Sequence, residues 1–73
     1  MSKYNDANMF NCGDYLQIIG FFDKTKSLIG KVIETYERSV RMTIISTNLS
    51  YSVGDIVYEY NTNCVRLEDY VEV

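Results

Sequence analysis

Six side chains in this sequence carry groups that can act as acids, bases or nucleophiles near predicted turns and strand ends: Asp14, Asp23, Asp55, Glu59, Cys12 and Cys64. The sequence contains no histidine, which excludes a histidine general base, an imidazole metal ligand and a Ser-His-Asp triad. The aspartates lie at loop ends and turns, where this residue usually bonds the backbone. Because the sequence also lacks a phosphate-binding glycine loop and a cluster of metal ligands, we expect no enzyme activity and no metal or cofactor.

The two cysteines, Cys12 and Cys64, are too few for a four-ligand zinc site. The first dozen residues are polar and lack the apolar segment of a signal peptide, and no apolar run reaches membrane-spanning length. We therefore expect a cytoplasmic protein with free thiols. The alternative is a disulfide, since the first and last strands of a closed barrel can be neighbours.

Two segments, 13–17 and 54–58, share a Gly-Asp pair placed directly before large apolar and aromatic residues. Gly and Asp tolerate the tight backbone conformations in which a loop turns into a strand. The residues that follow have the composition of strands. The repeat therefore predicts two loop-to-strand transitions, one near each end of a compact β-barrel.

The chain has the length of one small domain, and its composition predicts an all-β fold. We expect an N-terminal tail at 1–11 and a single domain at 12–73, with Met9 and Phe10 frayed, or docked onto the barrel or onto a partner. Gly20 indicates a bulge or a sharp bend in the first strand. Runs of β-branched and aromatic residues predict strands at 14–22, 28–37, 40–47, 56–60 and 64–67.

A helix at about residues 27–43 is the alternative for the middle of the chain. Apolar residues recur there every four positions, and Glu34 with Arg38 and Glu37 with Arg41 have the spacing of helical ion pairs. A period of four suits a strand as well as a helix. The β-branched composition favours two strands joined by a turn at 37–39.

Four segments carry a resemblance to a known fold: Gly13-Asp14, Gly30-Lys31-Val32, Gly54-Asp55-Ile56-Val57 and Val65-Arg66-Leu67-Glu68-Asp69. Their order over residues 12–73 resembles a small five-stranded SH3-like barrel of the KOW and Tudor type. The resemblance implies a fold and not a function, because this architecture hosts many unrelated activities. KOW-type modules that bind nucleic acid are usually basic, whereas the net charge of this chain is −3.

Seven tyrosines are more than a core of this size can bury with every hydroxyl bonded, so some must reach the surface. Tyrosine and arginine are also the residues that most often anchor protein interfaces. We therefore expect a non-catalytic protein-binding module. The alternative is a small single-stranded nucleic-acid-binding protein that uses the same aromatic and basic hairpin. The expected partner-binding residues are Tyr36, Arg38, Arg41, Tyr58 and Tyr60.

The composition is rich in Asn, Ile and Tyr and contains no proline, which resembles small proteins of bacteriophages and other mobile elements. That resemblance implies an accessory protein in the host cytoplasm that binds and inhibits or redirects a host protein. Exposed edge strands would also suit a homodimer. Nucleic acid fits less well, because Glu34 and Glu37 can neutralise the hairpin arginines.

Overall fold

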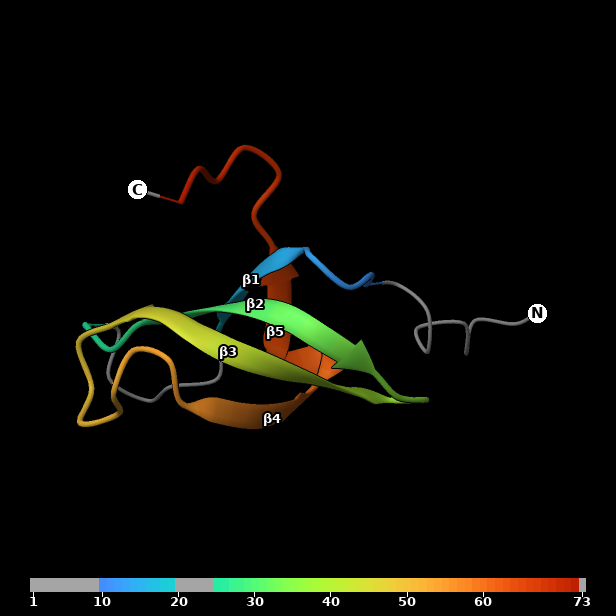
Figure 1. The fold of residues 1–73 in the computed structure, drawn as a ribbon, viewed down its shortest axis with the longest axis horizontal. Coiled ribbons are helices and arrows are strands. Elements are labelled where there is room, and N and C mark those ends of the chain that lie inside the picture. Colours follow the sequence, from blue (N-terminus) through green and yellow to red (C-terminus); the bar gives the residue numbers. More distant parts are fainter. Residues whose placement is uncertain (1–9, 20–24, 73) are drawn as a thin grey trace.

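The fold is one antiparallel sheet of five strands that curls into a half-barrel (Figure 1). The computed structural model describes residues 10–19 and 25–72. The strand order is β4-β3-β2-β1-β5, so the last strand returns to pair with the first. The prediction of an all-β, five-stranded, barrel-like fold is confirmed. The elements are β1 (Tyr15–Ile18), β2 (Leu28–Thr35), β3 (Ser39–Thr47), β4 (Ile56–Tyr60), the short 3-10 turn η2 (Asn61–Asn63) and β5 (Cys64–Arg66).

The middle of the chain forms a β-hairpin, and the alternative prediction of a helix at 27–43 is wrong. β2 and β3 pair from Leu28 opposite Thr47 to Thr35 opposite Val40. Along most of β3, buried and partly exposed residues alternate, which is the period of a half-buried strand. The β-branched residues of this region pack on a pleated surface, where their stiff side chains fit better than on a helix.

The start of the chain differs in extent from the prediction. β1 covers Tyr15–Ile18, inside the expected strand at 14–22. The bend expected at Gly20, like Asp23 and Met9, lies outside the described residues. The side chain of Phe10 is only 6% exposed and belongs to the core. Of the outcomes expected for Phe10, docking onto the barrel is the one observed.

The hydrophobic core lies on the concave side of the sheet. Leu49 and Val57 are partly buried and pack against it. β4 contributes Val57 to this packing, and none of its residues is fully buried. The buried members are Phe10, Leu16, Ile18, Leu28, Val32, Val40, Met42, Ile44 and Cys64.

Gly30 allows β2 and β3 to approach closely where the hairpin bends. A Cβ atom at this position would lie 2.8 Å from the Cβ and 2.9 Å from the Sδ of Met42. The pairing register of the two strands shifts next to it, between Ile29 and Gly30, and again between Val32 and Glu34. Irregularities of this kind bend a strand and increase its twist. Together they curl the hairpin around the core.

The two Gly-Asp segments fold alike, as the sequence repeat predicts. Gly13 and Gly54 have φ angles of 96° and 98°, a left-handed conformation that favours glycine. The N–H groups of Asp14 and Asp55 each donate to the carbonyl three residues earlier, at 3.0 Å in both cases. Each pair also bonds both peptide groups of one residue on the adjacent strand, β2 in the first case and β3 in the second. The repeat therefore starts β1 against β2 and β4 against β3.

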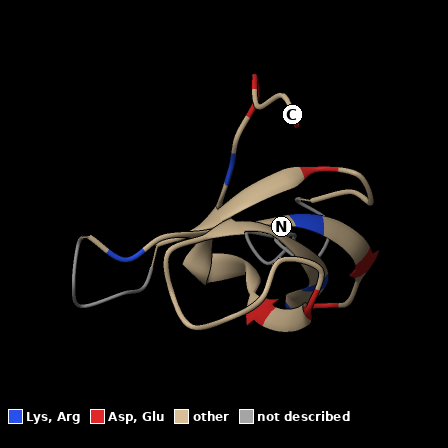
Figure 2. Ribbon diagram, turned by 60° about the vertical axis from the view of Figure 1, so that its left-hand side comes forward, with Lys and Arg blue, Asp and Glu red and all other residues tan. Residues whose placement is uncertain are grey.

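Charged residues of both signs are interspersed along the strands and loops (Figure 2). Arg66 on β5 lies 3.1 Å from Asp14 and 3.9 Å from Glu68, and Arg41 on β3 lies 2.7 Å from Glu34 on β2. All of these side chains are partly exposed, and an ion pair of this kind contributes about 0–1 kcal/mol to stability. The pairs therefore fix the positions of side chains more than they stabilise the fold.

Candidate functional site

Four of the five predicted partner-binding residues lie on the outer face of the sheet, and three of them, Tyr36, Arg41 and Tyr58, are in contact there. The rings of Tyr36 and Tyr58 stack with their centroids 6.2 Å apart and their planes 25° from parallel. Arg41 lies opposite Tyr58 in the strand register, and its Nη2 atom is 2.7 Å from Oε1 of Glu34. The Tyr36 hydroxyl donates to the same carboxylate oxygen at 2.9 Å. We call Glu34, Tyr36, Arg41, Tyr58 and Tyr60 the tyrosine face.

A β-bulge places Glu34 and Tyr36 on this face. Val32 is buried in the core, and the next paired residue of β2 is Glu34, opposite Arg41, so that Ile33 is the extra residue. Because side chains alternate along a strand, one extra residue moves Glu34 from the core side to the outer side. Tyr36 follows two positions later and faces the same way. Strict alternation in the sequence would have placed both side chains with Val32.

Arg41 is held in place by its neighbours. Its pKa is raised above the ordinary value, chiefly by a hydrogen bond with the Tyr58 side chain and also by the negative charge of Glu34. The pKa of the Tyr36 hydroxyl is also raised, mainly because this hydroxyl donates to Glu34. Both pKa shifts favour the protonated forms, so Tyr36 keeps its phenolic proton and Arg41 its positive charge at neutral pH.

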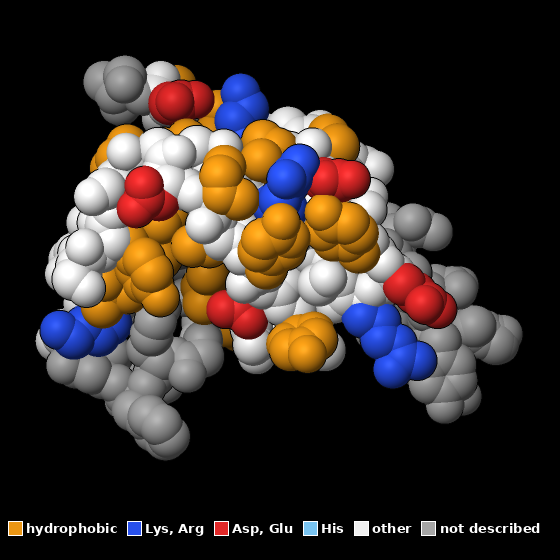
Figure 3. All heavy atoms as spheres, turned by 60° about the horizontal axis from the view of Figure 1, so that its bottom comes forward, with side chains coloured by type: hydrophobic (Ala, Val, Ile, Leu, Met, Phe, Trp, Pro, Cys, Tyr) orange, Lys and Arg blue, Asp and Glu red, His pale blue; other side chains and the backbone are white. Residues whose placement is uncertain are grey.

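Tyr60 extends the tyrosine face to the end of β4. Tyr58 and Tyr60 are 62% and 65% exposed. Tyr60 lies opposite Ser39 in the register, and the small serine leaves space beside the two large rings. A shallow hollow of about 250 Å³ is lined there by Ser39, Tyr58, Glu59 and Tyr60. Figure 3 shows hydrophobic side chains clustered beside adjoining basic and acidic side chains on one face of the molecule.

Arg38 is the predicted site residue that the structure leaves apart. It lies in the turn between β2 and β3 with an exposed side chain. Its carbonyl accepts a hydrogen bond from the Asn61 N–H at 2.9 Å. Among the described residues, no ion pair holds its guanidinium. Arg38 is therefore a solvent-facing cation at the hairpin end of the tyrosine face.

The carboxylates considered for chemistry serve the backbone near the strand starts. Asp14 accepts a hydrogen bond from the Asn11 N–H at 2.8 Å and another from Nε of Arg66 at 3.1 Å. Asp55 accepts one from the Ser52 N–H at 3.4 Å. Within residues 10–19 and 25–72, no three His, Cys, Asp or Glu side chains gather in a way that could hold a metal ion.

Both cysteines are free thiols, and the disulfide alternative is not observed. Cys12 is exposed, and its Sγ lies 3.5 Å from the carbonyl oxygen of Ile33. Cys64 is buried, and this burial, together with the charge of Glu59, raises the pKa of its thiol to about 11. A thiol that stays protonated at neutral pH is a poor nucleophile.

A second aromatic cluster, which sequence reasoning missed, holds the C-terminal segment against β1. The rings of Tyr15 and Tyr70 have centroids 4.9 Å apart, and the Tyr15 hydroxyl donates to Glu72 at 2.7 Å. This hydrogen bond is the main reason that the pKa of Tyr15 is raised. Nζ of Lys31 lies 5.6 Å from the centroid of the Tyr15 ring. The sequence carries no signal for this cluster, because it depends on the path of the chain after β5.

Two further members of the site follow from strand register. The sequence allows Glu34 to neutralise either hairpin arginine, and only the register selects Arg41. Ser39, which was expected in the turn, instead begins β3 and lines the hollow beside the tyrosines. That this small residue lies beside two large aromatic side chains can be recognised only after the strands are paired.

Compared with protein-family models, with curated proteins and with solved structures, the chain shows no match. In the part of the chain that the structure describes, no helix is long and apolar enough to cross a membrane. The geometry of the tyrosine face is the basis for the proposed function.

Proposed function

We propose that the protein is a non-catalytic protein-binding module that holds a partner protein on its tyrosine face. The half-barrel is then an SH3-like barrel related in architecture to KOW and Tudor-type modules. The proposal extends to an accessory protein of the bacteriophage type, acting in the host cytoplasm to inhibit or redirect a host protein. The observation that carries the binding proposal is the stacked pair of Tyr36 and Tyr58, with Arg41 held beside it.

Ring stacking supports this proposal because it orders the site before a partner arrives. Tyr36 is fixed by Tyr58 and by Glu34, so less side-chain freedom is lost when a partner binds. Tyr58 and Tyr60 nevertheless remain well exposed. Large aromatic side chains with these properties commonly anchor interfaces, and the hollow beside Ser39 offers space for a partner side chain.

Single-stranded nucleic acid is the second candidate, because Arg38 lies exposed near stackable tyrosines. The pairing of Arg41 with Glu34 disfavours this candidate, since it neutralises a cation that would otherwise contact phosphate. The interspersed charges of Figure 2 and the net charge of −3 also differ from a basic stripe.

Affinity capture from bacterial lysate tests the two candidates against each other, with nuclease-treated and untreated samples run in parallel. A discrete protein that survives nuclease treatment, and that is lost with Tyr58→Ala, supports the binding-module proposal. Val53→Ala is the control, because Val53 is 66% exposed in the loop before β4 and lies outside the tyrosine face. Recovery of nucleic acid, or of proteins that nuclease removes, would make the nucleic-acid candidate the leading one.

The placement of the site is tested separately by Tyr36→Ala and Arg41→Ala. Both residues are partly exposed, so both variants should keep the β-sheet circular dichroism of the wild type while binding the captured partner more weakly. Wild-type binding by both variants would show that the interface lies elsewhere.

A further inference from the structure

We propose that the open edge of β4 takes an extended, basic peptide segment of the partner as an added strand. This proposal rests on the proposed function, because it names the chemistry of the partner and a second contact surface on the other side of β4. This second contact surface differs from the tyrosine face, so the two proposals can fail independently of each other.

The first observation is the direction of the peptide groups of β4. At the two ends of the β3–β4 pairing, the Asp55 carbonyl accepts a hydrogen bond from Ile44 of β3, and the Asn61 N–H donates to Arg38, the residue just before β3. Alternate residues of a strand bond to the same neighbour, so Val57 and Glu59 continue this pairing. The remaining residues therefore point their N–H and C=O groups away from β3; they are Ile56, Tyr58 and Tyr60.

One end of this edge is already occupied. The Tyr60 N–H donates to Oε1 of Glu59 at 3.0 Å, and Sγ of Cys64 donates to the Tyr60 carbonyl at 3.5 Å. Within the described residues, no such hydrogen bond occupies the outward peptide groups of Ile56 or Tyr58. The edge is therefore open over a short stretch, which suits the addition of a few extended residues from another chain.

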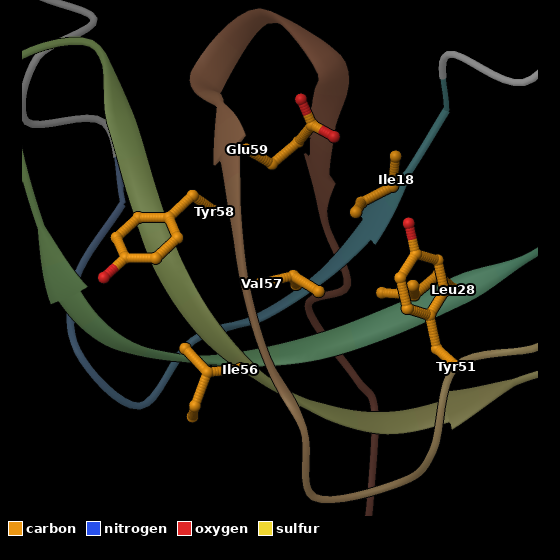
Figure 4. A pocket seen from close by; sticks show the side chains of 7 residues that line it. All are labelled: Ile18, Leu28, Tyr51, Ile56, Val57, Tyr58 and Glu59. Atoms are coloured by element: carbon orange, nitrogen blue, oxygen red, sulfur yellow. The ribbon is translucent and has the colours of Figure 1, made fainter.

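The second observation is a groove of about 370 Å³ along this stretch. One wall is β4 from Ile56 to Glu59, and the other is formed by Ile18, Leu28 and Tyr51. Figure 4 shows Val57 pointing toward Ile18 and Leu28, whereas Tyr58 points to the other side of β4. Because strand side chains alternate, an added strand would place every second side chain into this apolar groove.

The charge around the groove selects a basic segment. Glu59 is the charged residue of the lining, and its carboxylate is held by Tyr60 and by Nδ2 of Asn63 at 2.9 Å. Asp55 directly precedes β4, so a carboxylate lies at each end of the open edge. Lys or Arg flanking alternate apolar residues would complement both carboxylates. A second copy of this chain, with its net charge of −3, fits less well.

Selection from a random displayed peptide library against the purified full-length protein tests this inference. We expect enrichment of peptides that alternate apolar residues and carry Lys or Arg, with NMR shifts on both walls of the groove, at Ile56–Glu59 and at Ile18, Leu28 and Tyr51. N-methylation of alternate peptide bonds should weaken binding of a selected peptide at least tenfold, because it removes donors to the edge. Ile56→Pro should do the same, since its N–H points away from β3, whereas Ile56→Thr keeps the N–H and is the control.

Glu59→Gln provides a second test if Ile56→Pro does not fold. The amide keeps the acceptor oxygen for Tyr60 but loses the charge, so binding of basic peptides should weaken several-fold. Equal binding of N-methylated peptides, or no enrichment, would overturn the inference. Peptides that shift only the tyrosine face would also overturn it while leaving the proposed function intact. A concentration-dependent dimer abolished by Ile56→Pro would assign the edge to a second copy instead.

Discussion

Tyr36 and Tyr58 stack across a strand that belongs to neither of them. Tyr36 follows β2 and Tyr58 lies on β4, yet their ring centroids are 6.2 Å apart. The strand between, β3, contributes Arg41, which lies opposite both Glu34 and Tyr58. One row of paired residues thus joins three strands beneath the rings. The tyrosine face is therefore a property of the paired sheet and not of the hairpin alone.

Replacing Glu34 should change the titration of Tyr36. The carboxylate accepts a hydrogen bond from the phenol O–H, which stabilises the protonated form and raises the pKa of Tyr36. In Glu34→Gln the negative charge is gone, so this pKa should fall toward its ordinary value, as measured by NMR titration of the ring. Glu72→Gln is the matched control: it should lower the pKa of Tyr15 and leave Tyr36 unchanged. No change at Tyr36 would contradict the hydrogen bond on which the site depends.

Gly30→Ala should destabilise the protein. The new methyl group would lie 2.8 Å from Cβ of Met42, and a Cβ–Cβ contact cannot be relieved by a change of rotamer. Overpacking of this kind usually costs about 1–3 kcal/mol, which urea denaturation would measure. Ser46→Ala, at an exposed position of β3, is the control and should leave the midpoint nearly unchanged. Wild-type stability of Gly30→Ala would refute the close approach of β2 and β3.

Gly54 should be sensitive to substitution for a different reason. A Cβ there meets nothing within 4 Å, but the φ angle of 98° is one that side chains rarely adopt. Gly54→Ala should therefore lower stability by about 1–2 kcal/mol. Gly54→Asn should lower it less, because asparagine tolerates this backbone region better. Equal unfolding midpoints for both variants and the wild type would show that the turn before β4 does not require glycine.

Cys64 should make stability depend on alkaline pH. Its thiol ionises near pH 9.0 when exposed but near 11 in the fold. The folded state therefore resists ionisation, so the stabilisation is complete below about pH 9 and is lost as the pH rises toward 11. Cys64→Val cannot ionise, and the difference between its melting temperature and that of the wild type should change over this range. A constant difference from pH 8 to 11 would contradict the burial of the thiol.

The fold is largely predictable from residue types. β-branched runs and the two Gly-Asp pairs place strands and their starting points, because both signals are local. The extent of β1 and the docking of Phe10 depend on tertiary packing and were not predictable. Even the competing helix had a local signal, but in the sheet Glu34 pairs across strands with Arg41 and not with Arg38, as a helix would require.

The site is only partly predictable. Tyr58 and Tyr60 alternate with Glu59 on one strand, so their common face follows from the sequence. The face of Tyr36 does not, because the extra residue Ile33 reverses the alternation and nothing in the residue types marks a bulge there. For the same reason, the sequence could not separate Arg41, which the sheet holds, from Arg38, which it leaves in the turn.

The most direct test of the central claim is the affinity of the purified captured partner for wild type and Tyr58→Ala, measured at low and high salt. We predict a dissociation constant at least tenfold higher for Tyr58→Ala, since anchor residues contribute about 1–2 kcal/mol or more. Val53→Ala should bind like the wild type, and affinity should fall at most several-fold between about 50 and 200 mM salt, far less than for contacts with several phosphates. Wild-type affinity of Tyr58→Ala, or a steep loss of binding with salt, would contradict a protein interface centred on the tyrosine face.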